Sequence, residues 1–389
     1  MDIDLIRRQT RGCHDKIFLN SAGSSLVPDP VVQQMTDYLL EEAQVGGYAL
    51  AGRFDAEISD VYQQAAVLLN CAPQNIAFVG SATDAYAKAL SSVMFNKGDV
   101  ILTTDDDYIS NQLSFLSLKN RLDIEIVRAE NTPDGDIDLA SFEDLVIKHN
   151  PKLIAITHIP TNSGLVQQAE AVGDICRTYN ILYLLDACQS VGQLVVDVKK
   201  INCDFLTATG RKFVRGPRGT GLLYVSDRVL ASDMVPLIFD MQGASWTGVN
   251  DYQLAPTAKR FEFWESSIAG KLGLAAALRY INEIGIAEIE LYNQQLMKKF
   301  RSEMERVPGL QLHDKGSRLS SILTFTTANR SLEDTAQLLR DHQVYFSMSF
   351  RNFALIDFTK KDLDGVIRFS PHYFNTSQEL EKIIAILSL

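Results

Sequence analysis

The sequence predicts an α/β protein whose larger part is a doubly wound, mostly parallel sheet and whose C-terminal part is a smaller α+β domain. Three observations lead to this fold class. Short apolar runs recur along the first two thirds of the chain, amphipathic stretches separate them, and the pattern changes after Asp251. Runs that are apolar throughout are typical of parallel strands covered by helices on both faces.

Each apolar run has the length of a strand, and the stretches between the runs have the periodicity of helices. We expect strands at residues 76–79, 100–102, 124–127, 153–157, 181–185, 205–207 and 222–225. We expect helices at residues 82–94, 141–149 and 168–179. The turn sequences NKGD at 96–99 and TPDGD at 132–136 separate units, so the order is that of a repeated strand–helix–strand.

The C-terminal part predicts a mixture of helices and strands. A long helical pattern at 266–307 is interrupted near Gly285, and further helices are expected at 332–342 and 377–387. Strands are expected at 321–326, 344–347 and 366–369. We therefore divide the chain into a large domain at 16–255 and a small domain at 256–389, to which 1–15 is added. Residues 232–252 are weakly periodic and are interpreted as a functional loop.

Composition excludes several classes of protein. The chain of 389 residues carries a formal net charge of −11 and no long basic run, which argues against a nucleic-acid partner. No apolar stretch has the length of a signal peptide core or a membrane span, so we expect no membrane partner. The five cysteines are odd in number and lack CxxC pairs, which predicts neither disulfides nor a metal site. A cytoplasmic location is expected.

Two charged residues follow neighbouring predicted strands. Asp186 ends one apolar strand, and Lys212 follows the strand that begins near Asp204. The carboxyl ends of parallel strands form the ligand crevice of doubly wound folds, so the two side chains are expected to meet across one ligand. A lysine that forms a Schiff base, opposite an Asp that keeps a pyridine nitrogen protonated, is what pyridoxal 5′-phosphate (PLP) chemistry requires.

Three linked motifs surround these residues. They are DACQSVG at 186–192, TGRK at 209–212 and GPRGTG at 216–221. In this order they resemble the class V aminotransferase and cysteine desulfurase-like family of fold-type I PLP enzymes. The resemblance extends from LNSAGSSLVP at 19–28 to IRFSPHYFNT at 367–376. It implies a PLP-binding large domain of fold type I and a homodimer.

The resemblance also implies which residues bind the cofactor. Ala82 and Thr83, at a turn before a helix, would hold the cofactor phosphate at the helix N-terminus, and Thr209 would add a hydroxyl. Tyr108 falls where the family places the residue that stacks on the pyridine ring.

The substrate side follows from the same resemblance. Asn162 and Gln189 would reach the phenolic oxygen and the substrate. Arg368 matches the arginine that binds a substrate α-carboxylate through a bidentate pair, so an amino acid is the expected substrate.

The chain departs from the family at three places. Residues 345–367 contain no cysteine, whereas many cysteine desulfurases carry a nucleophilic cysteine there on a mobile loop. Trp264-Glu265 stands where the family has a Gly-Thr that binds the partner's phosphate, so that donor is left unidentified. Arg211 replaces a His that often precedes the lysine. We therefore expect a carbon–sulfur lyase without a loop cysteine, with an epimerase of the isopenicillin N epimerase-like kind or a class V aminotransferase as alternatives.

Simpler interpretations stay open for several residues. Lys212 could be a surface lysine, Asp186 a helix cap, Tyr108 a packed aromatic and Arg368 half of a structural salt bridge. His372 and Tyr373, near Arg368, are weak acid–base candidates. Strand alternation predicts that Cys188 points away from the cofactor and is a packed thiol. A PLP-fold binding module without activity is disfavoured by the presence of both Lys212 and Asp186.

Overall fold

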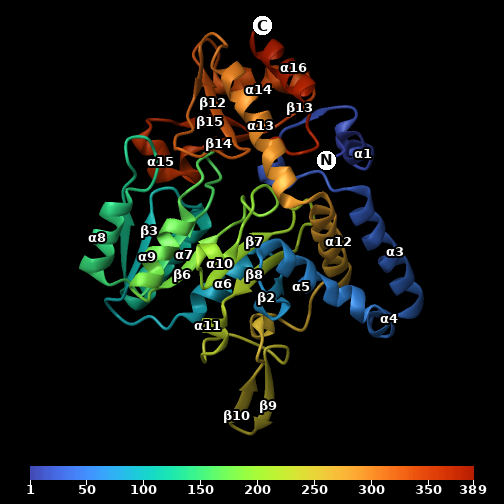
Figure 1. The fold of residues 1–389 in the computed structure, drawn as a ribbon, viewed down its shortest axis with the longest axis vertical. Helices are drawn as coiled ribbons and strands as arrows, with labels where there is room; N and C mark the ends of the chain where they lie inside the picture. Colours follow the sequence, from blue (N-terminus) through green and yellow to red (C-terminus); the bar gives the residue numbers. More distant parts are fainter.

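A seven-stranded sheet forms the centre of the computed structural model, which describes all 389 residues (Figure 1). The strand order is β2-β8-β7-β6-β5-β3-β4, and only β8 runs antiparallel to its neighbours. The strands are β2 (Ile76–Val79), β3 (Val100–Thr104), β4 (Glu125–Ala129), β5 (Leu153–Thr157), β6 (Leu182–Asp186), β7 (Phe205–Thr209) and β8 (Gly221–Val225). The predicted fold class is confirmed, and all seven predicted strands are present.

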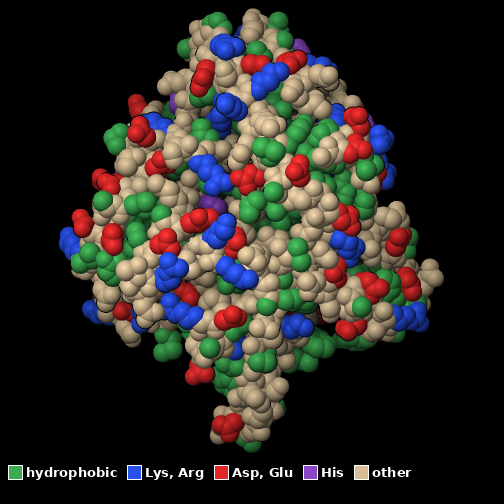
Figure 2. Space-filling view, in the orientation of Figure 1, with side chains coloured by type: hydrophobic (Ala, Val, Ile, Leu, Met, Phe, Trp, Pro, Cys, Tyr) green, Lys and Arg blue, Asp and Glu red, His purple; other side chains and the backbone are tan.

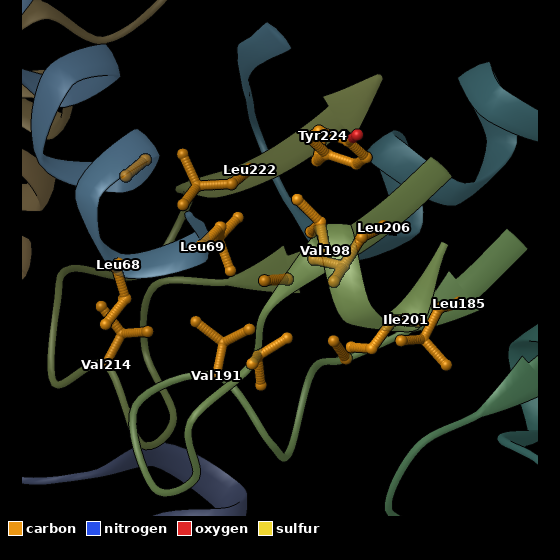
Figure 3. Packing of buried hydrophobic residues seen from close by; sticks show 14 of the residues in the cluster. Leu68, Leu69, Leu185, Val191, Val198, Ile201, Leu206, Val214, Leu222 and Tyr224 are labelled. Atoms are coloured by element: carbon orange, nitrogen blue, oxygen red, sulfur yellow. The ribbon is translucent and has the colours of Figure 1, made fainter. Parts of the chain in front are cut away.

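Alternate residues of these strands face two separate apolar cores. Tyr183 and Leu185 of β6 lie in one core, whereas Leu184 between them lies in the other. The first core is covered by α5 (Asp55–Leu69), α8 (Leu139–His149), α9 (Ala169–Thr178), α10 (Val198–Ile201) and α12 (Ile268–Ile284). The second is covered by α6 (Ala82–Ser92), α7 (Ile109–Leu122) and α11 (Asp227–Leu230). Figure 3 shows Leu69 of α5 beside Leu222 of β8, and Leu68 beside Val214, in the first core. Helices on both faces make the sheet doubly wound.

The N-terminal part of the chain adds elements that the sequence pattern did not reveal. They are α1 (Ile3–Arg8), η1 (Arg11–Cys13), β1 (Ile17–Phe18), α2 (Ser21–Ser24), α3 (Asp29–Val45), α4 (Gly47–Arg53) and η2 (Pro73–Asn75). Together with α5, α3 packs against α12 at one side of the molecule (Figure 1).

A four-stranded antiparallel sheet with three helices forms the C-terminal part. Its strand order is β11-β12-β15-β14, and α13, α14 and α16 share its apolar core. The elements are α13 (Ile286–Met304), β11 (Leu310–Leu312), β12 (Leu323–Thr327), α14 (Leu332–Asp341), β13 (Val344–Tyr345), β14 (Ser347–Phe350), η4 (Arg351–Phe353), α15 (Leu355–Lys360), β15 (Gly365–Phe369) and α16 (Ser377–Leu387). The N-terminal β1 pairs with β13 and so belongs to this part.

The predicted helical pattern at 266–307 is two helices, α12 and α13, that meet at Gly285. This residue has φ +90°, which a glycine adopts without strain, so the chain turns there. Side chains of α12 lie in the core of the large sheet, and those of α13 lie mainly in the core of the small one. The division at residue 255 stays a prediction, and on this packing we propose that the large domain extends to Gly285.

Residues 232–252, which were interpreted from the sequence as a functional loop, comprise an irregular segment followed by most of a β-hairpin. β9 (Ala244–Gly248) pairs with β10 (Asp251–Leu254), and the short η3 (Ala258–Phe261) follows. The hairpin projects from the body of the molecule at the bottom of Figures 1 and 2. None of the helices is both long and apolar enough to cross a membrane.

Candidate active site

A buried pocket opens at the carboxyl edge of the large sheet, where three neighbouring strands end in polar residues. Thr157 ends β5, Asp186 ends β6 and Thr209 ends β7. The pocket is lined by Ser81, Ala82, Thr83, Tyr108, Asn111, Thr157, Ile159, Thr161, Asp186, Cys188, Gln189, Thr209, Arg211 and Lys212. It therefore collects seven of the predicted site residues from four separate segments, as the ligand crevice of a doubly wound sheet does.

Asp186 is fixed by two hydrogen bonds and is 4% exposed. Its Oδ2 accepts from Asn111 Nδ2 at 3.0 Å, and its Oδ1 accepts from the backbone N–H of Cys188 at 3.0 Å. Both contacts hold the carboxyl group in place. The carboxylate can therefore hold a protonated ring nitrogen.

Asn111 is a site residue that the sequence reasoning missed. Its Nδ2 also lies 3.0 Å from Oδ1 of Asp107, four residues earlier, and 3.3 Å from Oγ1 of Thr157. Asp107 is buried, and burial raises its pKa despite hydrogen bonds from Thr157 and Asn111. The spacing of Asp107 and Asn111 at the start of α7 was the available signal, because residues four apart share a helix face.

Lys212 is buried and faces this pocket. Burial lowers its pKa, and the neighbouring Arg211 and Arg368 lower it further, whereas Asp186 acts in the opposite direction. A lysine with a lowered pKa carries more of the unprotonated amine, which is the nucleophilic form. Lys212 Nζ lies 5.8 Å from the centroid of the Tyr108 ring. The interpretation of Lys212 as a surface lysine is therefore wrong.

One end of the pocket is built for an anion. α6 begins at Ala82, and the backbone amides of Ala82 and Thr83 make no hydrogen bond within the chain. Ser81 caps the helix by accepting from the amide of Asp84. A helix N-terminus with free amides binds phosphate groups well. Gly221 makes room here, because a Cβ on it would lie 2.8 Å from the backbone of Ser81.

Gln189, Thr161 and Arg368 form a connected group on the substrate side. Gln189 Nε2 donates to Thr161 Oγ1 at 3.0 Å, and Arg368 Nη1 donates to the Thr161 carbonyl at 2.9 Å. Arg368 is buried, its Nε has no partner, and no carboxylate pairs with it. Burial lowers its pKa to about 10, with a further contribution from the positive charge of Arg211. An unpaired buried guanidinium is a binding group for a carboxylate ligand.

Two residues lie elsewhere than the sequence suggested. Asn162 does not line the pocket, because its Nδ2 donates to Asp357 of α15 at 3.0 Å, and Thr161 takes its place. Cys188 does line the pocket, although it was expected to point away. Since β6 ends at Asp186, Cys188 lies in a turn where strand alternation no longer applies. Burial and Asp186 raise the pKa of its thiol, so it is protonated.

His372 and Tyr373 are buried outside the pocket. The ring of His372 contacts the Phe213 carbonyl through Nε2 at 2.9 Å, and burial lowers its pKa below the usual range. A neutral, enclosed imidazole of this kind has a structural role. The two residues are therefore removed from the acid–base candidates.

Known proteins match almost the whole chain, both in sequence and in fold. The sequence model of "Aminotransferase class-V" matches residues 17–383. A probable cysteine desulfurase of Methanothermobacter thermautotrophicus is 29% identical over 384 residues, which cover 97% of this chain and 95% of that one. The apo structure of a cysteine desulfurase from Thermococcus onnurineus NA1 superposes with a TM-score of 0.91 at 26% identity, covering 100% of this chain and 98% of that one.

A third relative, C-DES, shares the fold at lower identity. Its complex with cysteine persulfide, described as the product of a cystine C–S lyase, has a TM-score of 0.86 at 22% identity and covers 98% of this chain and 99% of that one. A C-DES variant with glycine covalently linked to its PLP cofactor has a TM-score of 0.87 at 21% identity, covering 98% of each chain.

Proposed function

The chain belongs to the class-V aminotransferase family, and we propose that it is a PLP-dependent lyase that cleaves a carbon–sulfur bond of an amino acid. The observation that carries the proposal is that Lys212 and Asp186 share one buried pocket beside an unpaired Arg368. The names of the relatives, cysteine desulfurase and cystine C–S lyase, support a sulfur-containing substrate.

The residues present fit PLP. The phosphate would lie at the free amides of Ala82 and Thr83, with the hydroxyl of Thr209 nearby, and the ring nitrogen would face Asp186. Tyr108 would pack on the ring face. When bound, PLP supplies an electron-withdrawing ring that stabilises negative charge on a substrate carbon.

Lys212 has two roles in this proposal. Its Nζ would hold the cofactor, and its unprotonated amine would be the base for the proton on the substrate α-carbon. The lowered pKa of Lys212 favours both, because each role needs an unprotonated amine. The carboxyl group of Asp186 is held in the same pocket by Asn111.

Arg368 orients the substrate. Its Nη1 donates to the Thr161 carbonyl and its Nη2 to Asn20 Oδ1, while Nε has no partner. Binding a carboxylate here would fix the α-carbon near Lys212. Arg211 adds a second positive charge at the pocket wall, so the site favours an anionic substrate.

The fate of the sulfur follows from the segment 345–367. This segment has no cysteine and folds into β13, β14, η4 and α15. α15 is docked on the large domain, where Asp357 accepts from Asn162 and Lys360 pairs with Asp105. The protein therefore offers no thiol there to carry sulfur, and the sulfur would leave on a small molecule. Cystine and water would yield pyruvate, ammonia and cysteine persulfide, and cysteine would yield sulfide in place of the persulfide.

The test is a product assay on the PLP-loaded protein with cysteine and cystine. We expect pyruvate in stoichiometric amounts with sulfide or persulfide, and a visible absorbance band from the lysine-bound cofactor. Lys212→Ala should lose both, whereas the exposed Lys299→Ala should retain both. Alanine together with a protein-bound persulfide would contradict the lyase. Transfer of the amino group to a 2-oxo acid, or loss of chirality without cleavage, would identify the alternatives.

We further propose a homodimer. The loop and hairpin at 237–252 expose apolar side chains, among them Trp246 at 82% and Val249 at 88%. Exposed apolar groups gathered in one place mark an interaction surface. A nearby cavity contains Trp264 and Ser266, and the buried hydroxyl of Ser266 has no partner within the chain. Ser266 directly follows Trp264-Glu265, which stand in place of the family's Gly-Thr, so we propose that this region would face a second copy.

A cytoplasmic location and the absence of a nucleic-acid partner stay predictions. Arg368 is buried and Arg211 at the pocket wall is partly buried, so these two positive charges do not form an exposed basic surface.

A further inference from the structure

Arg215 is a fully buried cation without a carboxylate partner. Its Nε donates to the Leu26 carbonyl at 2.9 Å and its Nη2 to Thr10 Oγ1 at 2.6 Å, while Nη1 has no partner. Its Cζ lies 4.9 Å from the centroid of the Tyr373 ring and 4.8 Å from that of Phe374. Fully buried charged side chains are rare unless an opposite charge pairs with them, so this arginine needs an explanation.

Arg215 closes the turn that begins at Lys212. Its backbone N–H donates to the Lys212 carbonyl at 2.9 Å, and its φ of +61° is in the left-handed region, which a bulky side chain disfavours. The turn between them is also held from the small domain, because His372 contacts the Phe213 carbonyl at 2.9 Å and packs edge-on against the Phe213 ring. The turn that carries Lys212 is therefore held by Arg215 from one side and by His372 from the other.

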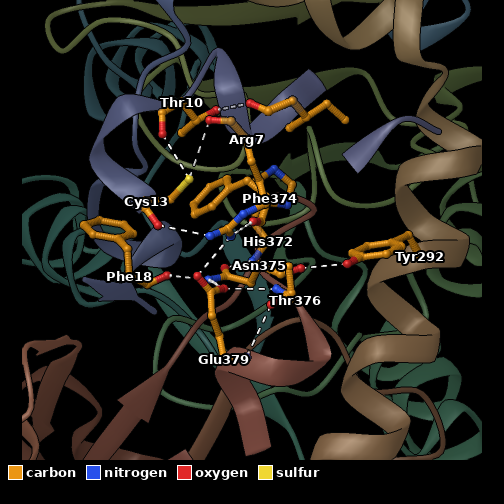
Figure 4. Close-up of polar contacts among 11 residues, drawn as sticks. Arg7, Thr10, Cys13, Phe18, Tyr292, His372, Phe374, Asn375, Thr376 and Glu379 are labelled. Carbon is orange, nitrogen blue, oxygen red and sulfur yellow. Dashed lines mark hydrogen bonds and ion pairs between the residues drawn. The ribbon is translucent and has the colours of Figure 1, made fainter. Parts of the chain in front are cut away.

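The contacts of Arg215 come from an N-terminal segment that also binds the small domain. Figure 4 shows Arg7 donating to the Phe374 carbonyl at 2.6 Å, to Glu379 at 2.9 Å and to the Cys13 carbonyl at 3.1 Å. Thr10, which accepts from Arg215, lies in the same segment. Residues 7–13 thus connect the turn of Lys212 to the turn that follows β15.

The turn after β15 is attached to the strand that carries Arg368. Asn375 fixes it by accepting from the His372 amide at 2.9 Å and donating to the Phe18 carbonyl at 3.1 Å. The Tyr292 hydroxyl donates to the Asn375 carbonyl at 2.7 Å (Figure 4). Both ends of the connection are therefore rigid, one at Lys212 and one next to Arg368.

We infer that Arg215 is a positioning residue that fixes the Lys212 turn against the N-terminal segment and the small domain, and so sets the separation of Lys212 and Arg368. The inference rests on the proposed role of Lys212. An arginine suits this place because its flat guanidinium packs on aromatic rings while its edge donates to oxygen atoms, which the point charge of a lysine does less well.

The test measures how fast the full-length protein, stripped of cofactor, captures PLP as a function of pH. The capture rate rises as the Lys212 amine loses its proton, so its midpoint reports the pKa of Lys212 in place. The titratable and charged groups around Nζ are Asp186, Cys188, Arg211, Arg368 and Tyr108, and none of them is changed. Loosening the turn would hydrate Nζ and raise the pKa toward its ordinary value.

Arg215→Met should raise the midpoint by about one pH unit and slow capture at neutral pH by about tenfold. Arg215→Lys should recover part of this, and Thr10→Val should shift the midpoint slightly in the same direction. The control is Arg301→Met, which removes a partly buried arginine, one bound to Asp314 and the Ser320 carbonyl in the small domain. It should lower the melting temperature and leave the midpoint unchanged.

A wild-type midpoint in Arg215→Met with a lowered melting temperature would refute the inference, since the residue would then only stabilise the fold. If Arg215→Met does not fold, Arg215→Lys and Thr10→Val test the inference instead. A wild-type pH midpoint of PLP capture in both variants would refute the inference. If Lys212→Ala captures PLP as the wild type does, the proposed role of Lys212 is wrong, which is a separate result.

Discussion

Asp106 is a buried carboxyl whose ionisation should make the protein less stable as the pH rises. It follows β3, is 5% exposed, and accepts a hydrogen bond from Asn131. Burial and, next, the charge of Asp357 raise its pKa to about 7, although Lys361 and Asn131 act in the opposite direction. It lines a polar cavity between the large domain and α15 together with Asp357 and Lys361.

The sign and size of the effect follow from linkage. An unfolded Asp has a pKa of about 3.9, so between about pH 4 and pH 7 the folded state binds more protons. The favourable contribution is complete below about pH 4 and is lost as the pH rises through about 7. A difference of about three pKa units corresponds to at most about 4 kcal/mol. Asp106→Asn keeps an acceptor oxygen and cannot ionise, so it should be more stable than the wild type at alkaline pH.

The assay is urea unfolding of both proteins across pH. The advantage of Asp106→Asn should grow by about 2 kcal/mol between about pH 5.5 and pH 8.5. Asp134→Asn, in an exposed position of the neighbouring turn, should show no such growth. An advantage that does not change with pH, or a variant that is less stable than the wild type at pH 8.5, would mean that Asp106 is ionised and paired with Lys361.

Three further predictions concern the site and the proposed dimer. Arg368→Lys keeps the charge and loses the two-pronged geometry, so KM for the amino acid should rise by about one to two orders of magnitude with a smaller change in kcat, measured by steady-state kinetics. Gly192 has φ +96°, and a Cβ on it would lie 2.5 Å from the Phe213 backbone next to Lys212. Gly192→Ala should therefore lower the free energy of unfolding by about 1–3 kcal/mol, measured by thermal unfolding, and lower PLP occupancy, measured by absorbance. Trp246→Asp should shift the protein toward monomer in light scattering, and an unchanged dimer would place the interface elsewhere.

The large sheet could be predicted because most of its strands are buried on both faces, so each reads as a short run of mainly apolar residues. The helices before it were not individually recognised. α3 carries exposed Leu39 and Leu40 at 50% and 61%, and α5 carries exposed Val67 at 57%. Apolar residues on the outer face blur the helical period on which the prediction depends. If the proposed dimer covers these residues, the same blurring would mark an interface.

The site was predictable where residues end regular strands and less so in irregular turns. Asp186 and Thr209 end strands, and both line the pocket. Thr161 and Asn162 lie in a turn without a period, so nothing in the sequence decided which of the two faces inward. Cys188 was placed by an alternation that had already ended at Asp186. Pattern arguments thus lose their force one or two residues past the end of an element.

Four basic residues within eight positions differ in burial and in surroundings, and the sequence pattern does not predict these differences. Arg218 is exposed, Arg211 lies at the pocket wall and donates to the Gly23 carbonyl, Lys212 is inside the pocket, and Arg215 is buried behind it. Identical charges acquire different functions from burial alone. Around the pocket the guanidinium groups of Arg211 and Arg368 and the amine of Lys212 face one carboxyl group, that of Asp186, in a chain whose net charge is −11. Because no acidic side chain completes this balance, a ligand that brings its own negative groups must do so, and an amino acid bound with a phosphorylated cofactor meets that requirement.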